Sequence, residues 1–464
     1  MILPGRKVVL FPIETVVREL DFRLLLGAYC ARPDTQIIIG KQSLLYDLVG
    51  RLQGGVFVGK NLAIWKSDSK YRRYKARGFR TIQLHEEGAI YEGSREDWAK
   101  CVNDFLNVEQ FEAEDYVCSW GEFQAECYRR RNPPCREHIV VTGHPRFDLF
   151  KPEFRALYED EVLRLKEKYG RFLLINTNFF WSNAKGMDFC FQWYEVKPDD
   201  QQKRTFYLDQ CCNSVVKWSR FMQLINHLSD RFPELQIVVR PHPSESIHYY
   251  TNLLRYVPRV HVVREGALQA WLLATEAVIH DGCTTAIEAH LARTRVINFH
   301  PIVDDRFDIP LPNLVGVSCA NEAEVEQALR RWLQDPNAVS AVTPENVARV
   351  KELIDNFGSN NSSFEKVARV VHKVLDEISP TKVTGAAPVL GRQRFKDALL
   401  RLLGPLDPQG WQIRLGKRDR GYQKFSPMKR AVVEERMRRI REITGRPVSV
   451  RYHSSQLLSM FLDS

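Results

Sequence analysis

Two adjacent carboxylates, Glu86 and Glu87, stand between the predicted strand 80–84 and Gly88. A carboxylate that follows a buried strand is costly to desolvate unless it reaches solvent or a ligand cleft. Either glutamate could act as a general base, a nucleophile or an electrostatic stabiliser. The alternative is a solvated acidic turn without a chemical role, and this segment taken alone favours that alternative.

A second polar group, which includes Arg240 and His242, ends another apolar run. Pro241 and Pro243 restrict the backbone on both sides of His242, which suits a side chain that must keep one direction. Arg240 offers a guanidinium that can bind a phosphate or a carboxylate through two parallel hydrogen bonds. We interpret this segment, with Ser244, as a contact for a phosphate or leaving group. A buried turn histidine with a satisfied hydrogen bond is the alternative.

The stretch 277–288 joins an apolar run to a helix start through a glycine turn. Gly282 permits the sharp turn, and Thr284 or Thr285 can cap the helix that follows. A helix start with free N–H groups and two hydroxyls is also an anion site, for which phosphate is the usual ligand. On this stretch alone, the capped turn and the anion site are equally good interpretations.

The elements that must position these groups are apolar runs of strand length that alternate with helical patterns. Such alternation predicts βα units and a parallel, doubly wound sheet. Ligands of open α/β sheets bind at the carboxyl ends of the strands, where the polar loop 176–179 with Asn178 also lies. We predict an α/β protein of two Rossmann-like halves, residues 1–168 and 169–379, that face a cleft. For the loop, simple capping is an equally good alternative.

Composition limits the kind of protein. No apolar run of about 18 residues occurs, and the N-terminus lacks a signal-peptide layout, so we expect a cytoplasmic protein. The ten cysteines show neither zinc-site nor disulfide-framework spacing. The formal net charge is +10, and residues 391–464 carry 17 Lys and Arg against 7 Asp and Glu, which accounts for the whole surplus. This distribution predicts a neutral body with a basic helical extension, residues 380–464, that meets an anionic partner.

Taken in order, these segments resemble the bacterial surface carbohydrate biosynthesis protein family, which is similar to GT-B glycosyltransferases of capsule and lipopolysaccharide assembly. The resemblance covers residues 7–375. It rests on Phe-Pro-Ile-Glu at 11–14 with Arg-Glu at 18–19, Glu-Glu-Gly at 86–88, Trp-Gly-Glu at 120–122, and segments 143–148, 176–179, 240–245 and 280–285.

The resemblance implies roles for particular residues. Bacterial sialyltransferases and β-Kdo transferases use an acidic-acidic-glycine motif for chemistry, a His-Pro motif for CMP and paired Ser/Thr hydroxyls for phosphate. Glu288 resembles the ribose-binding acid of many GT-B enzymes, with a surface helix carboxylate as its alternative. The resulting candidate site has Glu86, Glu87 and His242 as catalytic residues, and Arg240, Pro243, Ser244, Gly282, Thr284, Thr285, Glu288 and Asn178 as donor-binding residues.

The function implied is a glycosyltransferase that moves a sugar such as Kdo or a related ulosonic acid from a CMP donor to a glycan or glycolipid acceptor. Residues 1–168 are then the acceptor side and residues 169–379 the donor side. GT-B enzymes generally need no metal, and no metal or cofactor is expected. Related glycerophosphate transferases share the His-Pro and paired-hydroxyl layout. The donor nucleotide therefore stays open, because this chain has Arg-Pro-His-Pro and threonines instead of serines. The alternatives are a CDP-glycerol-type phosphotransferase, a UDP-sugar epimerase-like enzyme and a non-catalytic scaffold.

The predicted basic helix 428–444 could rest on the anionic inner-leaflet surface, which would make the protein a peripheral membrane protein. It could also dock a protein partner, and a solvated basic helix is the third interpretation. Nucleic-acid binding is not expected, because no aromatic-basic recognition motif accompanies the charge.

Overall fold

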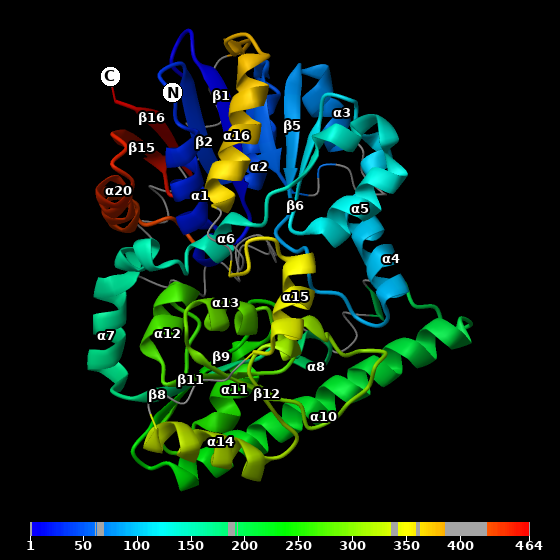
Figure 1. Cartoon of the computed structure of the whole chain (residues 1–464), viewed down its shortest axis with the longest axis vertical. Coiled ribbons are helices and arrows are strands. Elements are labelled where there is room, and N and C mark those ends of the chain that lie inside the picture. Colours follow the sequence, from blue (N-terminus) through cyan, green and yellow to red (C-terminus); the bar gives the residue numbers. More distant parts are fainter. Residues whose placement is uncertain are drawn as a thin grey trace, which may run out of the picture. The chain divides into compact units, whose positions relative to one another are not determined.

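The computed structural model describes residues 2–60, 62, 69–183, 191–192, 194–335, 342–358, 362–385 and 425–463. The chain forms two compact units (Figure 1). Unit 1 comprises Met1–Gly88, Ala99–Leu157 and Lys351–Ser464, and unit 2 comprises Ala89–Trp98 and Tyr158–Val350. This grouping differs from the predicted division at 168/169 and 379/380, because the chain returns to unit 1 after residue 350.

Unit 1 contains an eight-stranded sheet in the order β15-β16-β2-β1-β4-β5-β6-β7. The strands from β2 to β7 are parallel, and the sheet order changes direction in sequence between β1 and β4. Nearly all of β1 is buried, as in strands covered by helices on both faces. The parallel strands are β1 (Lys7–Ile13), β2 (Thr35–Lys41), β4 (Gly55–Gly59), β5 (Phe79–Leu84), β6 (Tyr116–Ser119) and β7 (Ile139–Val141).

The first helix of unit 1, α1 (Val16–Cys30), packs against α16 (Ser363–Asp376) and α20 (Arg430–Thr444). The buried face of α16 includes Val367, Val370, Val371 and Val374, the spacing of an amphipathic helix. The other helices of the unit include α2 (Gln42–Val49), α3 (Ser69–Ala76), α5 (Glu122–Arg131) and α6 (Pro145–Asp148), and α4 (Arg95–Phe105) begins in unit 2 and ends in unit 1.

The end of the chain completes the sheet of unit 1. Strands β15 (Val448–Ser454) and β16 (Leu457–Leu462) form an antiparallel hairpin, and β16 pairs antiparallel with β2. The fit is close, because a Cβ on Gly40 would lie 2.6 Å from a Leu457 methyl carbon. The predicted helix 428–444 is present as α20, whereas the hairpin was not predicted. The predicted helix 392–403 lies outside the described residues.

Unit 2 contains a six-stranded parallel sheet in the order β10-β9-β8-β11-β12-β13. In chain order this is 3-2-1-4-5-6, the Rossmann arrangement, which changes direction between β8 and β11. The strands are β8 (Phe172–Asn176), β9 (Gln236–Arg240), β10 (Val260–Val262), β11 (Ala277–His280), β12 (Arg295–Phe299) and β13 (Val317–Cys319). The helices include α7 (Glu159–Tyr169), α8 (Phe180–Asn183), α10 (Gln201–Arg231), α11 (Ile247–Leu254), α12 (Leu268–Ala274), α13 (Thr285–Leu291) and α14 (Glu322–Gln334), and α15 (Pro344–Leu353) begins in unit 2 and ends in unit 1.

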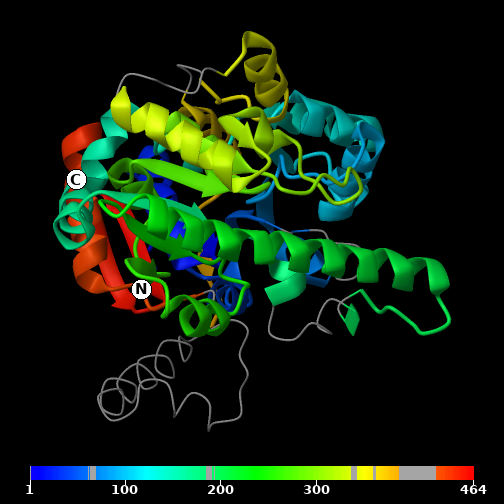
Figure 2. The same ribbon diagram turned by 90° about the horizontal axis from the view of Figure 1, so that it is seen from below.

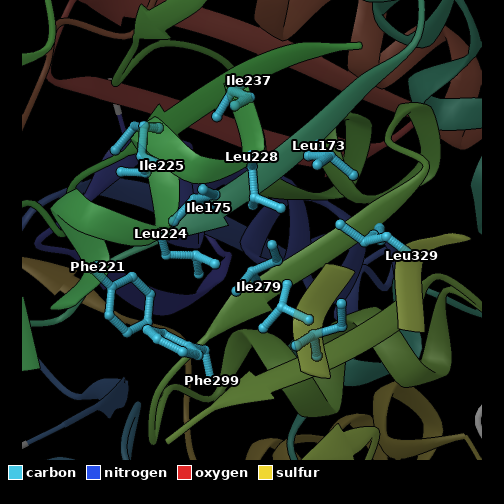
Figure 3. Close-up of a cluster of buried hydrophobic side chains, with 14 of the residues drawn as sticks. Leu173, Ile175, Phe221, Leu224, Ile225, Leu228, Ile237, Ile279, Phe299 and Leu329 are labelled. Atoms are coloured by element: carbon cyan, nitrogen blue, oxygen red, sulfur yellow. The ribbon is translucent and has the colours of Figure 1, made fainter. Parts of the chain in front are cut away.

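One face of this sheet packs on α10 and α14 through buried apolar side chains (Figure 3). Figure 2 shows α10 as one long helix; the buried positions along it start at Gln210, so its first turns lie outside this core. The two units, each an α/β domain built on a sheet of mainly parallel strands, confirm the predicted fold class of α/β with two Rossmann-like halves.

Candidate functional site

In unit 1 the predicted acid pair leaves the carboxyl end of β5. The carbonyl of His85 accepts a hydrogen bond from the Trp120 indole N–H (2.7 Å). A Cβ on Gly88 would lie 2.4 Å from carbon atoms of the same indole. The backbone carbonyl of Glu86 accepts from Arg18 (3.0 Å) and Arg146 (2.9 Å). The Glu-Glu-Gly segment is therefore fixed on both sides of the pair, and its glycine is required by the packing of Trp120.

Glu86 is buried, with 2% of its side chain exposed, and forms an ion pair with Arg23 (2.9 Å). Its other carboxylate oxygen lies 3.5 Å from His144 Nε2. His144 Nδ1 accepts the Arg146 backbone N–H (3.2 Å), so the neutral ring carries its proton on Nε2, which faces Glu86. Burial and the nearby arginine charges hold the pKa of His144 well below its usual range. These contacts indicate that Glu86 holds neighbouring side chains in position.

Glu87 has 55% of its side chain exposed and lies 3.5 Å from Arg18. Desolvation alone would raise the pKa of Glu87. The nearby positive charges have the larger effect and lower this pKa to about 2; the strongest is that of Arg18, followed by His85, Lys60 and Arg146. Glu87 is therefore ionised at neutral pH, and it is the carboxylate of the pair that solvent reaches.

The switch point of this sheet, at the ends of β1 and β4, holds a further charged group. Lys60 lies 2.8 Å from Glu14 and 3.3 Å from Glu19. Glu19 also accepts the backbone N–H groups of Glu14 (3.1 Å) and Thr15 (3.0 Å). Burial and the charge of Glu86 raise the pKa of Glu19, against the lowering effect of Lys60. The charges at this switch point are thus compensated by one another.

The segment 143–148 has a structural role in unit 1. The Asp148 carboxylate accepts the backbone N–H groups of Ser363 (2.5 Å) and Phe364 (3.3 Å), at the start of α16. Asn356 binds the backbone N–H and carbonyl of His144 (3.1 and 3.0 Å). Asp148 therefore acts as a cap for α16 and anchors the turn that carries His144.

In unit 2, four polar side chains lie in a row at the carboxyl edge of the sheet. Asn176 is in register with Arg240, and His280 is in register with Asn298. The residues just before them, among them Ile175 and Ile279, belong to the core of Figure 3. Because successive side chains of a strand point to opposite faces, the polar row lies on the other face of the sheet, at its switch point.

Arg240 is the cation of this row. Its guanidinium donates to the Gly266 carbonyl (3.1 Å) and lies 5.1 Å from the centre of the Trp271 ring. Burial lowers its pKa to about 9, so it remains charged at neutral pH. Its described contacts are a carbonyl and an aromatic ring and include no carboxylate. A partly buried guanidinium in these surroundings is suited to an anionic ligand.

His242 lies in the loop after β9. Its Nδ1 accepts the Ser244 backbone N–H (3.2 Å), so the neutral ring carries its proton on Nε2. Arg264 donates to the His242 carbonyl (3.2 Å), and the buried Glu245 accepts the His242 backbone N–H (2.7 Å). The predicted fixed direction of His242 therefore comes from these hydrogen bonds as well as from Pro243. Asn178, in the loop after the neighbouring strand β8, is exposed.

The turn after β11 corrects one prediction. Gly282 has φ +56°, as the tight turn requires. Neither threonine caps α13: Thr284 has φ −53° and ψ −22°, helical values that do not present its hydroxyl as a cap acceptor. The Thr285 hydroxyl instead lies 3.2 Å from the Cys283 sulfur. Glu288 is buried, which excludes the surface carboxylate interpretation.

Beside this turn lies a closed ring of four charges that the sequence analysis missed. Lys217 contacts Asp281 (2.9 Å) and Asp308 (2.7 Å), and His300 contacts the same two carboxylates (2.6 and 2.9 Å). The hydrogen bonds to Asp281 and Asp308 raise the pKa of His300 to about 9. A signal was available, because Asp281 and His300 follow neighbouring parallel strands.

Several arginines of α20 form ion pairs with carboxylates of the protein itself. Arg430 pairs with Glu434 (2.7 Å), and Arg438 pairs with Glu435 and Glu442 (both 2.6 Å). Arg436 is buried and pairs with Asp21 (3.2 Å). Nine of the basic residues of the tail lie within 391–424, outside the described residues.

In the described part of the chain, no helix is long and apolar enough to span a bilayer. The same residues contain no group of three or more His, Cys, Asp or Glu side chains that could hold a metal ion.

Comparison with known proteins gives similarity of fold. No protein-family model matches the sequence, and no curated protein matches it. A UDP complex of MnaA from S. aureus is 11% identical, over 80% of this chain and 98% of that chain, with a TM-score of 0.47. The wall teichoic acid polymerase TagF is 12% identical, over 81% and 91%, with a TM-score of 0.47. The UDP-GlcNAc 2-epimerase of Methanocaldococcus jannaschii is 12% identical, over 79% and 99%, with a TM-score of 0.44.

Proposed function

We propose that this chain is a nucleotide-sugar-dependent glycosyltransferase of surface polysaccharide synthesis that uses a CMP-linked ulosonic acid such as Kdo. The observation that carries the proposal is the carboxyl edge of the unit 2 sheet. There Arg240, a guanidinium whose described contacts include no carboxylate, lies on the strand next to the switch point between β8 and β11. Nucleotides bind at such switch points in Rossmann folds.

Each predicted donor-binding residue has a role that its surroundings allow. The Arg240 guanidinium and the His242 Nε2–H group are donors for the phosphate oxygens. The Thr284 and Thr285 hydroxyls offer further donors after the Gly282 turn, and the buried Glu288 is an acceptor for ribose hydroxyls. The backbone at Pro243 and Ser244 holds His242, and the exposed Asn178 offers an amide from the neighbouring loop.

The reaction breaks the bond between the anomeric carbon and the phosphate oxygen, whose electron pair leaves with CMP. The acceptor oxygen forms the new bond to the anomeric carbon, and its proton passes to the phosphate of the departing CMP. Cationic and N–H donors stabilise the charge that develops on the phosphate. With a pKa of about 2, Glu87 has low proton affinity, which suits attack on the anomeric carbon, or stabilisation of its positive charge, better than proton removal.

Nucleotide binding separates this proposal from its alternatives. Thermal-shift titrations of the full chain with CMP, CDP and UDP are expected to show stabilisation by CMP. Stabilisation by CDP alone would favour a glycerophosphate transferase, by UDP alone an epimerase-like enzyme, and by none of them a scaffold.

The rate of sugar transfer tests the roles of Glu87 and His242. Glu87→Gln and His242→Ala are each expected to lower transfer from a CMP-sugar at least about 100-fold, in the range that nucleophilic or general acid-base groups supply. Glu137→Gln, at an exposed position of unit 1, is the matched control and should keep full activity. Mass spectrometry of the product distinguishes a sugar from a glycerophosphate addition. Unchanged turnover in both site variants would refute the assignment.

A further inference from the structure

The most heavily hydrogen-bonded carboxylate of the unit 2 edge belongs to Glu245, which sequence reasoning did not assign to the site. One of its oxygens accepts the His242 backbone N–H (2.7 Å) and the Thr177 hydroxyl (2.8 Å). The other accepts the Phe179 backbone N–H (3.1 Å) and the Tyr250 hydroxyl (2.6 Å). The side chain is buried, with 3% of the residue exposed.

These four donors come from three parts of unit 2. Thr177 and Phe179 lie in the loop after β8, His242 lies in the loop after β9, and Tyr250 lies in α11. The carboxylate therefore joins the two loops that leave neighbouring strands at the proposed donor edge. Arg264 braces the same corner from outside, because it donates to the carbonyls of His242 (3.2 Å) and Glu245 (2.7 Å).

The arrangement has a consequence for the His242 ring. With the His242 backbone held by Glu245, the Ser244 backbone N–H is aimed at Nδ1 (3.2 Å). That contact requires Nδ1 to be the acceptor and puts the ring proton on Nε2. If the loop were released from Glu245, the Ser244 backbone N–H would no longer be held against Nδ1. Neither this tautomer nor this direction of the ring would then be favoured.

We propose that Glu245 is a positioning residue that locks the His242 loop against the 176–179 loop and so presents His242 with its proton on Nε2. The consequence for donor binding rests on the proposed function, whereas the effect on the His242 ring does not.

Glu245→Gln is the direct test, and the positions of the two backbone N–H donors make this substitution strongly disruptive. Each carboxylate oxygen receives one backbone N–H, and a backbone N–H cannot turn into an acceptor. In either orientation, the amide NH₂ of a glutamine would therefore face a backbone donor. Tyr250→Phe is the matched control, because it removes one hydroxyl from the same carboxylate and leaves both backbone donors in place.

The readout is the tautomer of His242 in the full chain labelled with ¹⁵N-histidine, its signals identified by their loss in His242→Gln. The wild type and Tyr250→Phe are expected to show a protonated Nε2 and an acceptor Nδ1. Glu245→Gln is expected to show tautomer averaging. An unchanged His242 spectrum in folded Glu245→Gln would overturn the proposal. If that variant does not fold, Glu245→Asp is the second test, because its shorter side chain cannot reach both backbone N–H groups. It is expected to show tautomer averaging, and an unchanged His242 spectrum in it would overturn the proposal.

CMP titration of the same samples tests the functional consequence. The dissociation constant is expected to rise about tenfold or more in Glu245→Gln, the size of one hydrogen bond to a charged group, and to change less than about threefold in Tyr250→Phe. A wild type that binds none of CMP, CDP and UDP would refute the proposed function alone, since the tautomer comparison still decides the role of Glu245.

Discussion

The ring of Lys217, Asp281, His300 and Asp308 predicts a specific dependence of stability on pH. His300 has a folded-state pKa of about 9, against about 6.5 in an unfolded chain. A group whose pKa rises on folding adds stability that is complete below the unfolded value and is lost as pH rises through the folded value. The difference corresponds to about 3 kcal/mol, at about 1.4 kcal/mol per pKa unit. His300 is 17% exposed, so solvent screening reduces this value little.

The assay is urea unfolding of the wild type and His300→Gln at intervals from pH 6 to pH 9.5. The wild type should exceed the variant by about 3 kcal/mol more at pH 6 than at pH 9.5, because only the wild type loses a charged imidazolium over this range. His261→Gln is the control, since burial lowers the pKa of His261 and leaves it neutral across the upper range. A difference between the wild type and His300→Gln that stays constant with pH would refute the reasoning.

Two further predictions concern unit 1. Gly88→Ala should lower the free energy of unfolding by about 1–3 kcal/mol, because the new methyl group meets the Trp120 indole. Gly385→Ala is its control and should leave thermal unfolding unchanged, because the nearest atom to its Cβ would be 3.8 Å away. Removal of residues 425–464 should lower Tm by roughly 10 °C or more or abolish soluble expression, because β16 pairs with β2 and buries Leu457, Leu458 and Met460. A truncated chain that melts like the full one would contradict the second prediction, and Arg430→Gln, on the exposed face of α20, controls for lost charge.

Most of the parallel strands were predictable from the sequence because they are short runs of mainly buried apolar residues. The exception is β13, whose three residues include the exposed Ser318 and which was not predicted. The runs at 8–13, 36–40, 172–176 and 277–280 are strands within a residue or two. Gly282 was predictable for a similar local reason, since a turn between a strand and a helix needs a positive φ. These features depend on neighbours along the chain.

The features that were not predicted depend on contacts between residues that are distant in the sequence. Arg23 reads as one charge on an amphipathic helix, yet it pairs with Glu86, 63 positions away. Glu245 reads as a polar loop residue, and its role appears only when Thr177 and Tyr250 converge on it. The hairpin at 448–462 was hidden because nothing local indicates that β2 is its partner.

The two switch points differ in how their charges are balanced, and this difference favours unit 2 as the side that binds the proposed anionic donor. In unit 1, Lys60 is matched by Glu14 and Glu19, and Arg23 is matched by Glu86. The protein itself therefore satisfies those cations, and Glu87 remains as an exposed negative charge that repels a phosphate. In unit 2, the described contacts of Arg240 are a carbonyl and an indole face, which leave its charge uncompensated. A phosphate that binds there gains an ion pair without breaking one, so unit 2 is the side on which the nucleotide is expected.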